Sequence, residues 1–105
     1  MTALYFDVGD RVAVTNAPSK GGESFADDDG VHFDPDAVTC IVTDPQGTAT
    51  TYTYGTDSNL TRLSLGVYRC EFDVDAAGGW RWSLRGELGN GENRGSSSGS
   101  FTARA

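Results

Sequence analysis

Positive charge is scarce in this 105-residue chain, in which 8 Lys and Arg residues stand against 15 Asp and Glu residues and give a net charge of −7. A protein that binds nucleic acid needs a basic face to displace counterions from phosphates, and one that docks on an anionic membrane needs positive charge as well. We therefore expect neither nucleic acid nor a membrane among its partners. The sequence has no apolar run near the roughly 20 residues that cross a bilayer. It also has no basic, then apolar, N-terminal stretch, so we expect no secretory signal.

Groups that carry out catalysis are equally scarce. The chain has one histidine, His32, and two cysteines, Cys40 and Cys70. Two cysteines without histidine partners make no zinc site. General acid–base catalysis needs a positioned pair of titratable groups, and no such pair stands out on the expected strands. We therefore expect no enzyme activity, no catalytic residue and no cofactor.

An acidic cluster occupies the first long connection of the chain. It comprises Asp27, Asp28, Asp29, Asp34 and Asp36. Loop carboxylates can bind calcium, but the spacing does not match an EF-hand loop. A solvated acidic loop is the simpler interpretation, with a surface that meets basic residues of a partner as an alternative. We expect no metal ligand here.

Hydrophobic periodicity predicts strands and no helix. Apolar residues alternate with polar ones, and the 14 glycines indicate many turns. Strands are expected at 8–15, 37–43, 48–54, 60–65, 67–74, 80–85 and 99–105. Hairpins are expected over 37–54, with a turn at Asp44–Gly47, and over 67–85. In the first strand, Val8, Val12 and Val14 should share one face. Long loops are expected at about 16–36, with a short edge strand near Val31–Phe33 as an option, and at 86–99.

About seven short antiparallel strands in one domain, residues 1–105, are typical of an all-β, immunoglobulin-like Greek-key β-sandwich. A small β-barrel is the structural alternative. The apolar faces of the expected strands predict the core. The predicted core residues are Val12, Val14, Val38, Cys40, Tyr68, Cys70, Phe72, Trp80, Trp82 and Phe101.

Cys40 and Cys70 both fall on apolar faces. They could form an inter-sheet disulfide, as in secreted immunoglobulin domains, or remain two buried thiols that pack as small hydrophobic groups. Because the chain has no secretory signal, we expect synthesis in a reducing compartment and favour two free thiols.

Aromatic residues could also form a platform for sugars. Tyr52 and Tyr54 share a face of their expected strand. The alternation of Trp80 and Trp82 with Arg81 is better explained by packing in the core than by an exposed platform.

Four stretches of the chain resemble a known group of proteins. These stretches are Asp7–Val12; Asp34–Thr39 continuing through Thr43–Thr48 to Tyr52–Gly55; Gly66–Arg69 with Phe72; and Gly79–Trp82 with Gly99–Thr102. Together they resemble the small immunoglobulin-like proteins encoded among the head and neck genes of tailed phages and prophages of actinobacteria and other high-GC hosts. Similar hairpins also occur in β-sandwich repeats of bacterial extracellular proteins. The first connection is longer and more acidic than is usual in the phage group, and cysteines are unusual there.

The resemblance implies a non-enzymatic structural component of a phage virion. Such a protein is made and assembled in the host cytoplasm. It would sit at the head–tail neck or connector, or on the capsid as a decoration protein, with capsid, portal or neck proteins and copies of itself as partners. The residues expected to contact a partner lie in the first long connection: Asp27, Asp28, Asp29, His32 and Phe33. The alternative function is a carbohydrate- or surface-binding β-sandwich module of a bacterial secreted protein. That alternative predicts exposed Tyr52 and Tyr54 and a bond between Cys40 and Cys70.

Overall fold

The computed structural model describes residues 5–18, 24–26, 31–89 and 93–105, and the named elements in these ranges are β-strands. The strands are β1 (Tyr5–Asp7), β2 (Arg11–Thr15), β3 (Ala37–Thr43), β4 (Ala49–Thr53), β5 (Leu60–Ser64), β6 (Val67–Asp73), β7 (Gly78–Glu87) and β8 (Asn93–Arg104). The expectation of an all-β chain is confirmed. No membrane-crossing helix is found in these ranges.

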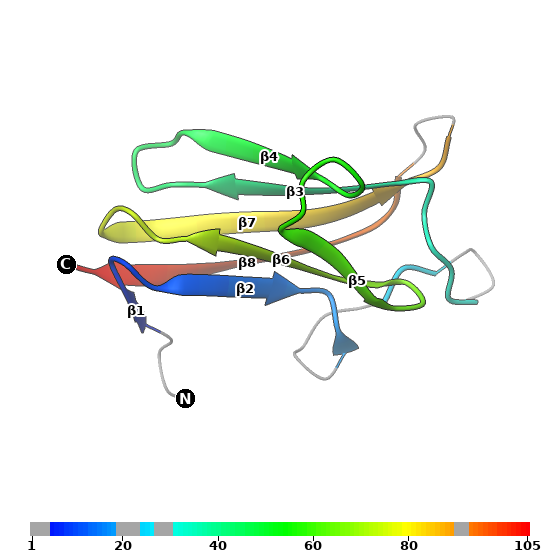
Figure 1. The fold of residues 1–105 in the computed structure, drawn as a ribbon, viewed down its shortest axis with the longest axis horizontal. Helices are drawn as coiled ribbons and strands as arrows, with labels where there is room; N and C mark the ends of the chain where they lie inside the picture. The colour runs from blue at the N-terminus through cyan, green and yellow to red at the C-terminus, as the bar shows by residue number, and fades with distance from the viewer. Residues whose placement is uncertain (1–4, 19–23, 27–30, 90–92) are drawn as a thin grey trace.

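The strands form two sheets (Figure 1). The large sheet has five strands in the order β1-β8-β7-β3-β4, and the small sheet has three in the order β2-β6-β5. The small sheet is antiparallel throughout, whereas the large sheet is mixed because β1 runs parallel to β8. The buried faces of both sheets contribute to one hydrophobic cluster, which gives a sandwich-like arrangement. About seven strands, all antiparallel, were expected. The structure corrects this expectation, because it has eight strands among the described residues and β1 pairs with β8 in parallel.

The first expected hairpin is confirmed. β3 and β4 pair in antiparallel register, with Cys40 opposite Tyr52 and Val42 opposite Thr50. The Asp44 carboxylate closes the turn by accepting the backbone N–H groups of Gln46 and Thr48 at 3.0 and 2.9 Å. Gly47 adopts a φ of 89°, which L side chains rarely adopt. The local turn signal was therefore sufficient to specify this pairing.

The prediction of a second hairpin, over 67–85, is wrong. β6 belongs to the small sheet and β7 to the large one, so the chain crosses between sheets after Asp73. The Val74 N–H donates to the Asp10 carbonyl before this crossing. Phe72 and Trp80 consequently meet across the core, with stacked rings 6.1 Å apart. Alternation specifies which face of a strand is buried, but it does not specify which strand is its neighbour.

The loop expected at 86–99 is also wrong. β7 continues to Glu87, and β8 begins at Asn93 and pairs with it in antiparallel register. Repeated Gly and Ser obscured this strand because both residues have weak β-propensity. Packing explains why one of these residues, Gly99, is glycine. A Cβ atom at Gly99 would lie 2.8 Å from the indole nitrogen of Trp82, so only glycine lets the ring lie over the neighbouring strand.

The single strand expected at 8–15 is two strands joined by a turn. β1 joins the large sheet and β2 the small one, and Gly9 turns the chain between them with a φ of 100°. Val8 lies in this turn and is 43% exposed, so it does not share the core face of Val12 and Val14. The strand option near Val31–Phe33 reduces to one isolated bridge between Ala26 and His32.

Nine of the ten predicted core residues are buried, and the tenth, Trp82, is half-buried against the core. Buried apolar residues outside that prediction are Phe25, Val42, Leu60, Val67, Val74, Leu84 and Ala103. Phe25 is the unexpected one, since it lies within the connection expected to be a polar loop and is 2% exposed. That connection is therefore attached to the core.

Candidate docking surfaces

The predicted partner-contact loop is only partly described. Asp27, Asp28 and Asp29 lie outside the described residues. His32 is exposed, and Phe33 is half-buried with its N–H donated to the Phe25 carbonyl at 3.1 Å. In the described part of this loop, the His32 imidazole is therefore accessible, and the backbone of Phe33 is attached to the buried Phe25.

Gly66, in the turn between β5 and β6, anchors this connection. Its N–H donates to Asp34 Oδ1 at 2.9 Å, and its carbonyl accepts the Phe25 N–H at 2.9 Å. A Cβ atom here would lie 2.8 Å from the Phe25 carbonyl oxygen, and the φ of 73° disfavours any L side chain. Only glycine permits this approach of the two backbones.

Asp34 is the ionic partner at the same anchor. Arg62 Nε lies 2.9 Å from its Oδ2, and the Tyr68 hydroxyl donates to its Oδ1 at 3.2 Å. The guanidinium of Arg62, followed by the Gly66 N–H, lowers the pKa of the Asp34 carboxyl. Burial, followed by the charge of Asp34, raises the pKa of Tyr68 to about 12. As an ionised carboxylate, Asp34 therefore attaches the first long connection to the turn between β5 and β6.

Asp34 and Asp36 do not build a metal centre with their neighbours. The Asp36 carboxylate accepts the Gly89 N–H at 2.6 Å, and Asp34 is engaged as described above. Among the described residues, no group of three or more His, Cys, Asp or Glu side chains is arranged to hold a metal ion.

Asn16 attaches the end of β2 to β6. It is fully buried, its Oδ1 accepts the Tyr68 N–H at 2.8 Å, and its Nδ2 donates to the Gly66 carbonyl at 2.9 Å. A side-chain amide thus continues the ladder beyond the last residue of the strand. Nothing in the sequence pattern distinguished this asparagine from a loop residue.

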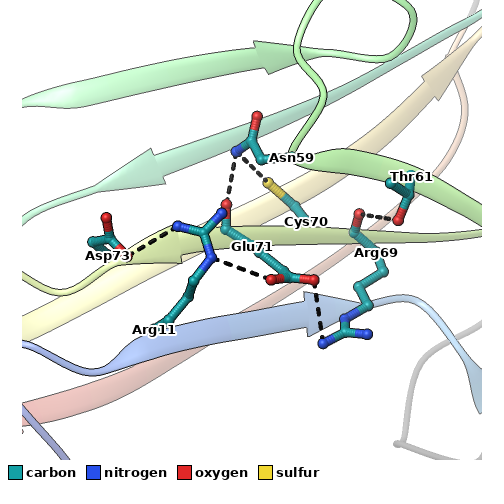
Figure 2. Close-up of polar contacts among 7 residues, drawn as sticks. All are labelled: Arg11, Asn59, Thr61, Arg69, Cys70, Glu71 and Asp73. Carbon is teal, nitrogen blue, oxygen red and sulfur yellow. Dashed lines mark hydrogen bonds and ion pairs between the residues drawn. The ribbon is translucent and has the colours of Figure 1, made fainter.

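The outer face of the small sheet carries a charge network of four residues: Arg11, Arg69, Glu71 and Asp73 (Figure 2). Arg11 contacts Glu71 at 3.2 Å and Asp73 at 2.9 Å, and Arg69 contacts Glu71 at 3.3 Å. The hydrogen bond to Asp73, followed by that to Glu71, raises the pKa of Arg11. Two positive and two negative groups neutralise each other on this face.

The outer face of the large sheet is different. Its strands bury alternate residues, so the residues between them point outward, and the registers place them in adjacent rows. We call this surface the Ser/Thr face. Its residues are Thr39, Ile41, Thr43, Ala49, Thr51, Thr53, Arg81, Ser83, Arg85, Ser96, Ser98, Ser100 and Thr102. Nine of the thirteen are serine or threonine. The acidic side chains on the same side of the sheet, Asp7 and Glu87, lie at its margins and pair with Arg104 and Arg85.

Arg81 is the arginine of the Ser/Thr face that has no ion-pair partner among the described residues. Arg85 Nε lies 3.1 Å from Glu87 Oε1 and is thereby paired. Arg81 is exposed, between Thr43 and Ser100 on the neighbouring strands, and has no acidic partner among the described residues. It is therefore available to a carboxylate of another molecule.

An apolar groove of about 630 Å³ runs beside β2. Its walls include Phe6, Val12, Val14, Trp82 and Phe101, so it lies at the side of the sandwich where β2 faces β1 and β8. Val12 and Val14 use their backbone to pair with β6, which leaves the opposite edge of β2 outside the ladder.

The two tyrosines of the proposed sugar platform are not equivalent. Tyr52 is half-buried against the core, and burial raises its pKa. Tyr54 is 44% exposed and meets Tyr68 edge-on, with ring centroids 5.1 Å apart. The pair therefore offers one exposed ring and no flat two-ring surface.

Comparison of the chain with protein-family models, curated protein sequences and solved structures gives no match. The function is therefore inferred from the geometry of the chain itself and from its resemblance to the phage proteins named above. Sequence reasoning missed the Ser/Thr face because Ser96 and Ser98 of its β8 row were assigned to a loop. The alternation of Arg81, Ser83 and Arg85 with buried residues was the signal that could have indicated an outward-facing row on this sheet.

Proposed function

We propose that this chain is a non-enzymatic structural component of a tailed-phage virion that docks through the Ser/Thr face. Its position would be the head–tail neck or connector, or the capsid surface as a decoration protein. Its partners would be capsid, portal or neck proteins and further copies of the chain. The observation that carries the docking proposal is the contrast between the two outer faces of the sandwich.

Desolvation makes the Ser/Thr face the better docking surface. A partner that covered the charge network of the small sheet would have to remove water from four charged side chains. The cores of protein interfaces are depleted in charged residues, and arginine is the charged type enriched there. The Ser/Thr face meets this description, since its neutral hydroxyls surround Ile41 and Arg81. The two acidic side chains at its margins, Asp7 and Glu87, are paired with arginines, so little of the net charge of −7 lies on this face.

The strand order supports an immunoglobulin-like Greek-key topology. In that fold, strands B, E and D lie in one sheet and C, F and G in the other. β2, β6 and β5 take the order of B, E and D, while β3, β7 and β8 take that of C, F and G. β4 adds a further strand beside β3, as in variable-type domains. This topology agrees with the family that the sequence resembles.

The alternative, a sugar-binding module, has less support. It requires a flat exposed aromatic surface at Tyr52 and Tyr54, and Tyr52 is half-buried.

Mass spectrometry of gradient-purified phage particles tests the virion assignment. Copy number is scaled to the major capsid protein. Hundreds of copies per particle indicate capsid decoration, and about six to twelve indicate a ring at the neck. Absence from particles rejects the virion assignment and leaves the binding module as the leading hypothesis.

Charge reversal tests which face docks. Arg81→Glu puts a carboxylate on the Ser/Thr face, and we expect at least a tenfold drop in copies per particle with an unchanged thermal midpoint. Arg11→Glu makes the same change in charge on the small sheet and is the matched control. Equal incorporation of both variants at wild-type level would exclude docking through Arg81.

A further inference from the structure

Cys40 and Cys70 meet at the centre of the molecule. Cys40 lies on β3 of the large sheet and Cys70 on β6 of the small sheet. Both side chains are 0% exposed and belong to the common hydrophobic cluster. The two thiols are free, and they lie close enough across the interface between the sheets for each to shift the pKa of the other. Their strands therefore bring two sulfur atoms into contact from opposite layers.

We propose that Cys40 and Cys70 are an oxidation site that closes to an inter-sheet disulfide. The bond would join β3 to β6, which take the places of strands C and E. It would thus differ from the bond between strands B and F of antibody domains. The inference is independent of the proposed virion function, since it depends only on the packing of the two sheets.

The surroundings of the two sulfur atoms are unequal. The Asn59 side chain donates to Cys70 Sγ at 3.8 Å, a contact drawn as a dashed line in Figure 2. The hydrogen bond from Cys40 lowers the pKa of Cys70, and the same bond, followed by burial, raises the pKa of Cys40. Because the Asn59 N–H donates to Cys70 Sγ and would stabilise a thiolate there, we assign Cys70 as the nucleophile of the pair and Cys40 as the thiol that resolves the intermediate.

The oxidant is a peroxide. The Cys70 thiolate attacks one oxygen of hydrogen peroxide, the O–O bond breaks, and the departing hydroxide takes up the thiol proton to leave as water. The Cys40 sulfur then attacks the Cys70 sulfenic acid. The S–O bond breaks, the S–S bond forms, and the Cys40 proton leaves with the oxygen as a second water. Two thiols lose two electrons in total, and one peroxide becomes two waters.

Full burial makes this reaction slow in the folded chain. An oxidant reaches sulfur atoms with no exposed surface only when the sheets part or before they have packed. We therefore expect oxidation by peroxide to accelerate at denaturant concentrations just below the unfolding transition. Once formed, the bond closes a loop of about 30 residues and restricts the unfolded chain.

The test treats the full chain with hydrogen peroxide and measures its intact mass, its free thiols after denaturation and its thermal midpoint. We expect a monomer that has lost two hydrogen atoms and has no alkylatable thiol. Its midpoint should be about 10 °C or more above that of the reduced chain, and a phosphine reductant should reverse the shift.

Cys40→Ala and Cys70→Ala are the control variants, and neither should show the loss of two hydrogens or the rise in midpoint. If a variant does not fold, non-reducing peptide mapping of the wild-type chain still identifies the linkage. Peroxide-treated wild type that keeps two free thiols, accumulates sulfinic acid or forms only intermolecular dimers would overturn the proposal. A disulfide that lowers the midpoint would overturn it too.

Discussion

The two sheets of this sandwich are held in different ways. The large sheet depends on its backbone ladder, in which β7 pairs with both β3 and β8 along most of its length. The small sheet has two ladders, and side chains bonded to the backbone of the β5–β6 region supplement them. Asn16 and Asp34 bond the backbone at Gly66 and Tyr68, and Asn59 donates to the Glu71 carbonyl at 2.7 Å.

The difference shows what a small sheet needs when its ladders are few. Backbone groups buried at the end of a strand must find partners, and unpaired ones are strongly destabilising. In the small sheet, residues distant in sequence supply those partners, so its stability should depend on single side chains. The large sheet should tolerate comparable substitutions better.

Substitution of Gly66 should have the largest effect. Gly66→Ala places a methyl group 2.8 Å from a backbone oxygen at a positive φ, and we expect a loss of about 3 kcal/mol or more in the free energy of unfolding. Gly47→Ala, in the β3–β4 turn of the large sheet, is the matched control. It has a similar φ of 89° and no atom within 4 Å, so we expect about 1 kcal/mol. Equal losses in urea denaturation would remove the contrast between the sheets.

Removal of the Asn16 amide should come next. Asn16→Ala leaves the buried Tyr68 N–H without its acceptor, and we expect a loss of about 2 kcal/mol. Thr61→Ala is the control in the same sheet, since the Thr61 hydroxyl is exposed and lies 3.4 Å from the Arg69 carbonyl. Hydrogen exchange should show faster opening of β6 in Asn16→Ala and unchanged exchange in Thr61→Ala. Unchanged protection of β6 in both variants would mean that Asn16 does not hold the strand.

The Asp34 anchor should make stability depend on pH. Because its folded pKa lies below the ordinary 3.8, Asp34 contributes stability that is present above that value and is lost as the pH falls through the folded pKa. Tyr68 acts in the opposite range. Its pKa rises from 10.0 to about 12, so stability should decline with pH between these values. Asp34→Asn should flatten the acid limb of a plot of thermal midpoint against pH, and Tyr68→Phe the alkaline limb. An unaltered acid limb in Asp34→Asn would assign the acid dependence to other carboxylates.

The charge network should matter least, although it is the most conspicuous polar feature of the small sheet. Its side chains are all more than a third exposed, and exposed ion pairs contribute little to stability. Glu71→Gln should change the thermal midpoint by less than about 2 °C, and 1 M salt should reduce even that difference. A shift as large as that of Asn16→Ala would show that the network, too, holds the sheet.

The sequence was sufficient to predict the features that depend on local pattern. Alternation located β3 to β6, and the Asp44–Gly47 turn predicted the β3–β4 hairpin. Alternation could not assign strands to sheets, because Phe72 and Trp80 show the same alternation whether their strands pair or face each other. The part of β8 before Gly99 was taken for a loop because Trp82, which makes glycine necessary at position 99, is distant in the chain. Phe25 and Asn16 were missed for the same reason, since their partners meet them only in the folded state.

The parallel pairing of β1 with β8 has a mechanical consequence. Tyr5 lies opposite Thr102 and Asp7 opposite Arg104, with both strands running in the same direction (Figure 1). Tension that pulls the start of β1 away from the end of β8 therefore acts along the strands. It loads all the hydrogen bonds of this ladder in shear at once, and it does not open them one after another. The molecule should thus resist stretching between these two strands more strongly than peeling of β4 from the opposite edge.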